Sequence, residues 1–241
     1  MSTAATAPDL TLPLLGGRHH FLLRRLHSLT GILFGGYVIV HLIVNATLVQ
    51  GGVGADNIYQ MQVNKIHALP FLWVIEWTFI YIPIIFHTIY GLYITFTAQP
   101  NVVRYPYEKN IFYGFQRLTA LVIVVFLIFH VLGMKGAFGH TLQFQDKDAA
   151  FSAARHVNSS WIVAYIVYPL GVLCSCYHLA NGFWTAGITW GLTVSAGAQR
   201  RWGWVCAILF VITLASGTIA LAWLLAHPHL APLGVALNRT A

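Results

Sequence analysis

The chain has 241 residues, of which 58% are hydrophobic and 8% are charged. Soluble domains carry about 25% charged residues, so a chain this poor in charge cannot cover a water-facing surface. Composition therefore excludes a soluble globular protein and favours a polytopic membrane protein. The net charge of +7 comes from basic residues between apolar runs. We expect them to face a lipid leaflet or an acidic subunit, and we expect no nucleic-acid partner.

Five apolar runs are long enough to span a bilayer, which takes about 20 helical residues. They cover residues 26–49, 71–98, 118–134, 161–190 and 203–227. Residues 1–20 have no small-residue cleavage site after a short apolar core, so they resemble a tail rather than a secretory signal. We predict an all-α bundle of five transmembrane helices over residues 21–227, with an outer tail at 228–241. Kinks are expected at Pro83, Pro169 and Gly171.

Lysine and arginine residues in the connections predict the orientation. Eight lie on the side that holds the N-terminus and five lie on the opposite side. Because cytoplasmic loops carry the excess of Lys and Arg, we expect the N-terminus to be cytoplasmic and the C-terminus to lie outside.

Four of the twelve histidines lie well inside apolar runs, one on each of the first four: His41, His87, His130 and His178. An ionisable residue inside a membrane span is costly and usually functional. One such histidine could simply bond across helices, but four of them, one per helix, indicate a cofactor site.

Depth in the membrane sorts these histidines into two pairs. Counted from the outer ends of their spans, His41 and His130 lie about 9 and 5 residues deep, whereas His87 and His178 lie about 14 and 17 residues deep. At about 1.5 Å per residue, the two levels differ by roughly 12 Å. Two histidines at one level suit axial ligation of a haem, whereas zinc takes three or four ligands. The sequence therefore predicts two haems.

Glycines follow three of these histidines by about one turn: Gly91, Gly133 and Gly182. A glycine there would let a flat macrocycle lie against the helix. Glycine also serves close helix packing in membranes, so both interpretations remain open.

The segments around the histidines resemble those of the diheme cytochrome b subunits of succinate:menaquinone reductases and quinol:fumarate reductases, of the single-anchor, five-helix type. The matching segments are RRLHSLTG (24–31), HLIVN (41–45), FHTIYGLYITFTA (86–98), QRLTA (116–120), FHVLG (129–133) and YHLANGFWTAGITWGLTVS (177–195). The resemblance covers roughly residues 20–225, and its most specific segment is 178–190.

The resemblance implies that His87 and His178 hold a proximal haem b and that His41 and His130 hold a distal haem b. It implies a flavoprotein subunit that oxidises succinate and an iron–sulfur subunit docked on the cytoplasmic face. Electrons would pass through the two haems to a quinone near the outer side, with menaquinone as the expected acceptor. The chain has three cysteines and no dinucleotide-binding fingerprint, so we expect it to be the membrane anchor, in a prokaryotic cytoplasmic (inner) membrane.

Basic and polar residues gather at the inner ends of two spans. Arg24, Arg25, His27 and Ser28 lie at the end of the first, and Arg117 lies at the end of the third. Basic groups pair with carboxylates, so these residues are candidates to hold haem propionates. They are equally candidates to dock the iron–sulfur subunit or to form the ordinary basic flank of a membrane helix.

Glu76 is the one carboxylate within the apolar runs, near the outer end of the second. It is a candidate to exchange protons with a quinone, and the alternative is an interfacial residue in contact with water. Some fumarate reductases of the resembled family carry a glutamate two positions before the haem histidine of helix four. Cys176 stands there in this chain, which argues against a proton path at that position.

Three alternatives remain open at this stage. A quinol:fumarate reductase subunit would run the reverse electron flow, and sequence does not set the direction. An anchor of a formate or nitrate enzyme is disfavoured by the segments HLANGFW and RRLHS. A transporter with a histidine proton relay is disfavoured because no broken-helix repeat is evident.

Overall fold

The computed structural model describes residues 17–50, 57–97 and 107–230, and all the regular elements in these ranges are helices. The α-helices are α1 (Gly17–Ala46), α2 (Ile58–His67), α3 (Leu72–Glu76), α4 (Ile82–Thr97), α5 (Glu108–Met134), α6 (Ala149–Val157), α7 (Tyr168–Thr189) and α8 (Ala196–Ala226). Most of the two predicted tails, residues 1–16 and 231–241, lies outside the described residues.

Five helical segments are long and apolar enough to cross a membrane, which confirms the predicted all-α fold with five spans. They are His19–Val49, Leu72–Thr97, Asn110–Met134, Val163–Thr189 and Ala196–Ala226. The first, third and fifth begin earlier than their apolar runs, because helices continue through basic residues at the membrane interface. The fifth begins where the Ser195 hydroxyl accepts a hydrogen bond of 3.2 Å from the backbone N–H of Ala198, a typical N-cap.

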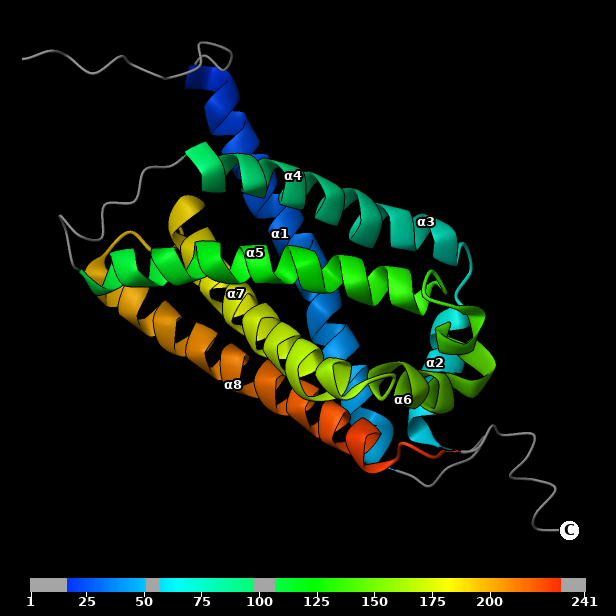
Figure 1. Cartoon of the computed structure of the whole chain (residues 1–241). Helices are drawn as coiled ribbons and strands as arrows, with labels where there is room; N and C mark the ends of the chain where they lie inside the picture. Colours follow the sequence, from blue (N-terminus) through cyan, green and yellow to red (C-terminus); the bar gives the residue numbers. More distant parts are fainter. Residues whose placement is uncertain (1–16, 51–56, 98–106, 231–241) are drawn as a thin grey trace, which may run out of the picture.

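The spans cross one another at the middle of the bundle. Helix α7 packs against α5, α8 and α1, while α4 packs mainly against α1. In Figure 1, α1 passes behind α4 and α5, so it contacts elements on both sides of the bundle. Side chains from α1, α4, α5 and α7 therefore meet in the interior.

A π-helical turn precedes each span proline. Trp77–Tyr81 forms one before Pro83, and Val163–Val167 forms the other before Pro169. Proline lacks the N–H that an α-helix needs and clashes with the carbonyl four residues back. The wider turn accommodates that conflict and adds a residue to the helix, which rotates everything beyond it. Both π turns thus set the rotational phase of α4 and α7.

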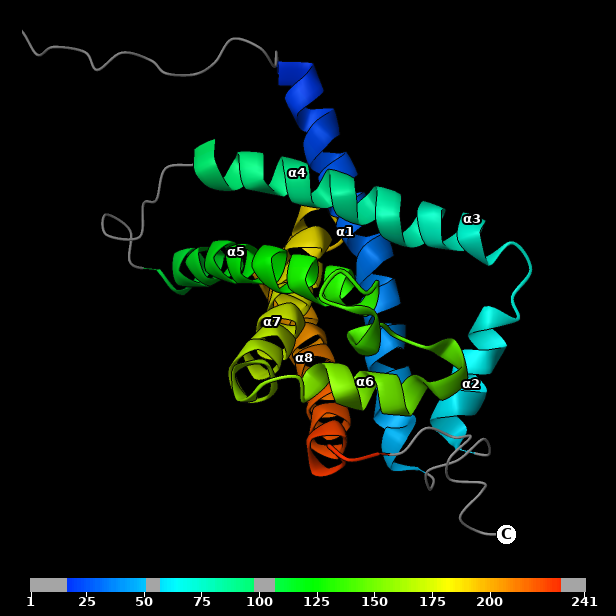
Figure 2. The ribbon, with the colours of Figure 1, turned by 45° about the vertical axis from the view of Figure 1, so that its right-hand side comes forward.

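Two short helices that sequence analysis did not predict, α2 and α6, cover one end of the bundle (Figure 2). We call this the capped end; it holds the ends of α1, α5 and α8. The opposite end, with the starts of α1, α5 and α8, is the open end.

Gln60 of α2 connects the two short helices of the capped end. Its amide nitrogen donates to the Asp146 carbonyl at 2.6 Å, and its oxygen accepts from the Ala149 N–H, at the start of α6, at 3.0 Å. The main buried cluster, including Leu48 and Val157, lies beneath.

Gly171 lets α7 approach α5 closely, because a Cβ at this position would overlap the ring of Phe126. We predict that Gly171→Ala lowers the free energy of unfolding by about 1–3 kcal/mol, since overpacking forces side chains off their preferred rotamers. The matched control is Gly36→Ala on α1, where an added Cβ meets nothing within 4 Å. Thermal unfolding in detergent would measure both, and equal stability of the two variants would contradict the packing described here.

Candidate cofactor site formed by two pairs of intramembrane histidines

The four span histidines meet as two pairs inside the bundle. His87 on α4 faces His178 on α7, with ring centroids 6.2 Å apart and ring planes at 85°. His41 on α1 faces His130 on α5, with centroids 6.1 Å apart and planes at 77°. These are the pairs that depth in the membrane predicted. No group of three or more His, Cys, Asp or Glu placed to hold a metal ion occurs in residues 17–50, 57–97 and 107–230.

The separation within each pair fits one metal ion between two rings. When two imidazole nitrogens each bind a metal at about 2.0 Å, the ring centroids lie about 6 Å apart. Both pairs have this spacing. The donor set, two histidines from facing helices, is that of a haem iron with two axial imidazoles.

Backbone carbonyls orient the rings of the His87–His178 pair. Nδ1 of His87 lies 3.0 Å from the carbonyl oxygen of His27, and Nδ1 of His178 lies 3.1 Å from that of Gln116. A carbonyl only accepts, so each Nδ1 carries the proton and each Nε2 keeps its lone pair for a metal.

A tyrosine plays the same part at the His41–His130 pair. The Tyr168 hydroxyl lies 3.0 Å from Nδ1 of His130, and Phe126 stacks on the same imidazole at a centroid distance of 5.6 Å. The ring of His41 contacts Tyr37, one turn earlier on α1, at 5.6 Å. Three of the four imidazoles therefore have their Nδ1 bonded within the protein.

Two of the three glycines that follow the histidines make room for another side chain, and the third, Gly182, has only ordinary contact with its neighbour. A Cβ on Gly91 would meet His27 at 3.1 Å, one on Gly133 would overlap His156, and one on Gly182 would meet Gln116 at 3.6 Å. His27 also stacks on His87, with centroids 4.0 Å apart and planes at 12°. Each pair thus has a third histidine nearby. His27 lies against Gly91, one turn beyond His87, and His156 lies against Gly133, one turn beyond His130.

His156 is the residue that sequence analysis missed. It lies outside the five apolar runs, yet it is 0% exposed on the inner face of α6. Residues 149, 152, 153, 154, 156 and 157 of α6 are buried. In the sequence, the four-residue spacing of Ala149, Ala153 and Val157 is the pattern that could have revealed this face. Burial lowers the pKa of His156, against an opposing effect of the Leu142 carbonyl.

The predicted propionate contacts on α1 lie at the open end, where Arg25 and Ser28 both contact Trp190. Arg25 lies 5.0 Å from the ring centroid of Trp190, whose indole N–H donates to the Ser28 hydroxyl at 3.0 Å. Arg24 is exposed. Of the four candidates on α1, His27 is the one in ring contact with a paired histidine.

Arg117, the fifth candidate, secures the end of α4. Its guanidinium donates to the carbonyl of Thr95 and lies 5.7 Å from the ring centroid of Tyr113. These contacts place it at the open end with the other candidates, where it helps to close α5 onto α4.

Glu76 has a connection to the His41–His130 pair. It is half-buried at the end of α3 and lies close enough to Tyr37 to interact with it electrostatically. Tyr37 in turn contacts the ring of His41. The one span carboxylate is therefore linked electrostatically to a tyrosine that contacts this pair.

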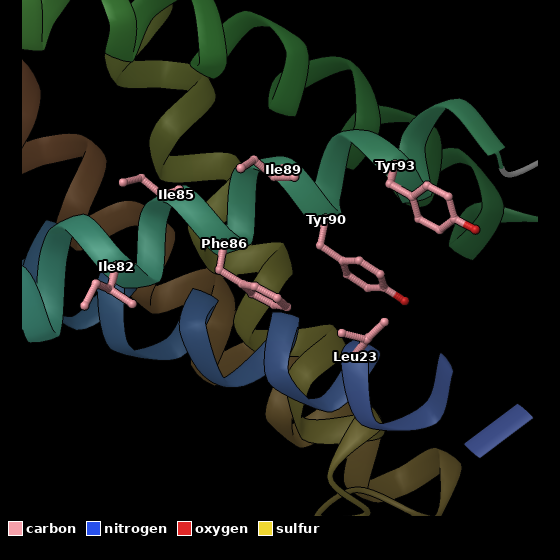
Figure 3. Close-up of a pocket in the computed structure, with 7 residues that line it drawn as sticks. All are labelled: Leu23, Ile82, Ile85, Phe86, Ile89, Tyr90 and Tyr93. Atoms are coloured by element: carbon pink, nitrogen blue, oxygen red, sulfur yellow. The ribbon is translucent and has the colours of Figure 1, made fainter. Parts of the chain in front are cut away.

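A groove of about 530 Å³ between α1 and α4 is separate from the histidine pairs. It is lined by Leu23, Ile82, Ile85, Phe86, Ile89, Tyr90 and Tyr93. Figure 3 shows the Phe86 and Tyr90 side chains extending from α4 toward Leu23 on α1. This stripe of α4 excludes His87, so the groove offers apolar surface and takes no part in the paired site.

The fold and site define a polytopic helical membrane protein in which two pairs of histidines face each other inside the bundle. No family model matches the sequence. Over 200 residues the chain is 32% identical to the succinate dehydrogenase cytochrome b558 subunit of Bacillus subtilis (strain 168), an alignment that covers 82% of this chain and 93% of the relative.

The chain therefore belongs to the family of cytochrome b subunits of succinate dehydrogenase. This confirms the resemblance seen in its histidine segments and removes the transporter and the formate or nitrate enzyme as alternatives. Its five spans make it a multi-pass membrane protein.

Tyr168 provides a test of how the His41–His130 pair is oriented. We predict that Tyr168→Phe weakens retention of a haem at this pair by about 10-fold or more, because the hydrogen bond to Nδ1 of His130 is lost. The midpoint potential of that haem should rise, since an imidazole without this acceptor is less basic and stabilises ferric iron less. Haem quantification and a redox titration would measure both effects. Tyr165→Phe, at a tyrosine that is 66% exposed, is the matched control and should change neither.

Proposed function

We propose that this chain anchors a succinate:quinone oxidoreductase in the membrane and that its paired histidines hold two b-type haems. The supporting observation is the geometry of the pairs: ring centroids 6.2 and 6.1 Å apart, from helices that are distant in sequence. The relative's name, a cytochrome b558 subunit of succinate dehydrogenase, supports the same cofactor class.

His87 and His178 would bind one haem, and His41 and His130 the other. Bound there, the two haems would supply one-electron carriers between the iron–sulfur subunit and a quinone. The part of this chain is to fix the imidazoles: carbonyls of His27 and Gln116 hold one pair. The surrounding helices also exclude water from the site.

The open end is the proposed cytoplasmic face, where the flavoprotein and iron–sulfur subunits would dock. Arg24, Arg200 and Arg201 are exposed there, in agreement with the excess of basic residues on that side of the chain. Leu192 and Val194, between α7 and α8, are 76% and 87% exposed. Apolar side chains beside exposed arginines suit a protein partner.

The capped end is the proposed outer side, where a quinone would accept electrons and protons. Glu76 supports this placement, because its charge acts on Tyr37, whose ring contacts that of His41. A carboxyl group at this position could exchange protons with the outer water phase. Menaquinone is the proposed acceptor, on the family resemblance of the histidine segments, and a prokaryotic cytoplasmic membrane is the proposed location.

The haem proposal is tested by replacing single histidines. We expect two haems b per chain in the purified complex, measured from reduced-minus-oxidised absorbance and haem quantification. His41→Ala and His130→Ala should each remove or alter one haem, and His87→Ala and His178→Ala should each affect the other. His140→Ala, at an exposed histidine of the cap, is the control. A loss pattern that does not follow the two pairs would contradict the assignment.

Glu76 is tested separately from the haems. We predict that Glu76→Gln lowers quinone reduction by succinate about 100-fold, because the amide cannot release a proton. Haem content and succinate oxidation with an artificial dye should stay unchanged. Glu108→Gln at the open end, where the carboxylate is exposed, is the matched control. Equal quinone reduction by the two variants would show that Glu76 is an ordinary interfacial residue.

A further inference from the structure

His156 is buried without the partners that its chemistry requires. It is 0% exposed, and neither Nδ1 nor Nε2 has a hydrogen-bond partner. The Leu142 carbonyl lies near enough to influence the ring, but it does not meet hydrogen-bond geometry with either nitrogen. Buried polar groups in proteins are almost always bonded, so an unpaired imidazole indicates a missing partner.

The surroundings of His156 connect it to the His41–His130 pair. Its ring is seated on Gly133, one turn beyond His130. It also contacts the rings of Phe129 at 5.6 Å and Tyr168 at 6.0 Å. Tyr168 is the residue that bonds Nδ1 of His130, so His156 lies in the layer of side chains immediately around this pair.

The other pair has an equivalent histidine. His27 is seated on Gly91, one turn beyond His87, and its Nδ1 is also buried without a partner. Its position at a helix end made it a predicted contact for a haem propionate. The two sites are therefore built alike, from a pair of axial histidines, a glycine one turn on and a third histidine against that glycine.

A haem held by His41 and His130 would need hydrogen-bond donors for its propionates at the capped end. His156 can supply one. A haem carries two propionate carboxylates, and a buried carboxylate requires hydrogen-bond donors. The predicted contacts Arg24, Arg25, His27, Ser28 and Arg117 all lie at the open end. The printed contacts of His156 are with rings and with Gly133, and neither of its nitrogens has a hydrogen-bond partner in the protein.

We propose that His156 is a positioning residue that donates a hydrogen bond to a propionate of the haem held by His41 and His130. The inference rests on the proposed function, since it requires that haem. It assigns a role to α6, which lies across the capped end (Figure 2) and brings His156 to the bundle. The cap would then anchor the haem as well as close the bundle.

The test uses His156→Phe in the complete complex, because phenylalanine retains a ring against Gly133 and removes both nitrogens. We expect a lower midpoint potential for one haem, since an unbonded propionate keeps more negative charge near the iron and favours the ferric form. This is opposite in sign to the shift expected for Tyr168→Phe. The propionate bending band in the resonance Raman spectrum should also move. His156→Gln, which can still donate, should restore part of both effects.

His140→Phe in the same cap is the control and should change neither the potential nor the Raman band. An unchanged band and potential in His156→Phe, with a raised KM for quinone, would overturn the proposal and assign His156 to the quinone. If the phenylalanine variant does not assemble, His156→Leu decides, because leucine also cannot donate a hydrogen bond and an unmoved band there overturns the proposal. The haem content of the unmodified complex separates the haem proposal from the proposed role of His156. Two haems per chain, with no effect of the His156 substitutions, would refute only the role of His156.

Discussion

An imidazole inside a bilayer must find a partner for each of its nitrogens, because lipid offers none. This constraint organises the bundle. Carbonyls on α1 and α5 accept the Nδ1 protons of His87 and His178, and the hydroxyl of Tyr168 is hydrogen-bonded to Nδ1 of His130. The second nitrogen of each of these three rings then remains available to bind a ligand. A hydrogen bond from the protein to Nδ1 therefore leaves Nε2 of the same ring available to bind a ligand.

Helix phase is what directs the rings toward each other. The π turns at Trp77–Tyr81 and Val163–Val167 precede the helices that carry His87 and His178. Each turn inserts a residue ahead of a proline, so the helix beyond it is rotated relative to the segment before it. Such turns are frequent at functional sites. Gly171 then admits Phe126, which stacks on His130, so packing and ligation depend on the same contacts.

The sequence predicted the features that arise from hydropathy and helical rise. The five spans and the pairing of the histidines by depth follow from the lengths of the apolar runs and from a helical rise of about 1.5 Å per residue. The sequence could not predict side-chain direction, which depends on tertiary neighbours. Arg25 turned out to lie against Trp190 and Arg117 against the end of α4. The cap helices were missed because runs of 10 and 9 residues are too short and too polar to register as spans.

The angle between paired rings tests directly whether each pair closes on one haem iron. The planes of the two imidazoles meet at 85° in one pair and 77° in the other. Nearly perpendicular axial imidazoles leave two iron d orbitals almost equal in energy, which makes the low-spin ferric signal highly anisotropic. An electron paramagnetic resonance spectrum of the oxidised complex should therefore show two such signals of equal intensity. A spectrum with high-spin iron, or with signals typical of parallel imidazole planes, would contradict the site described here.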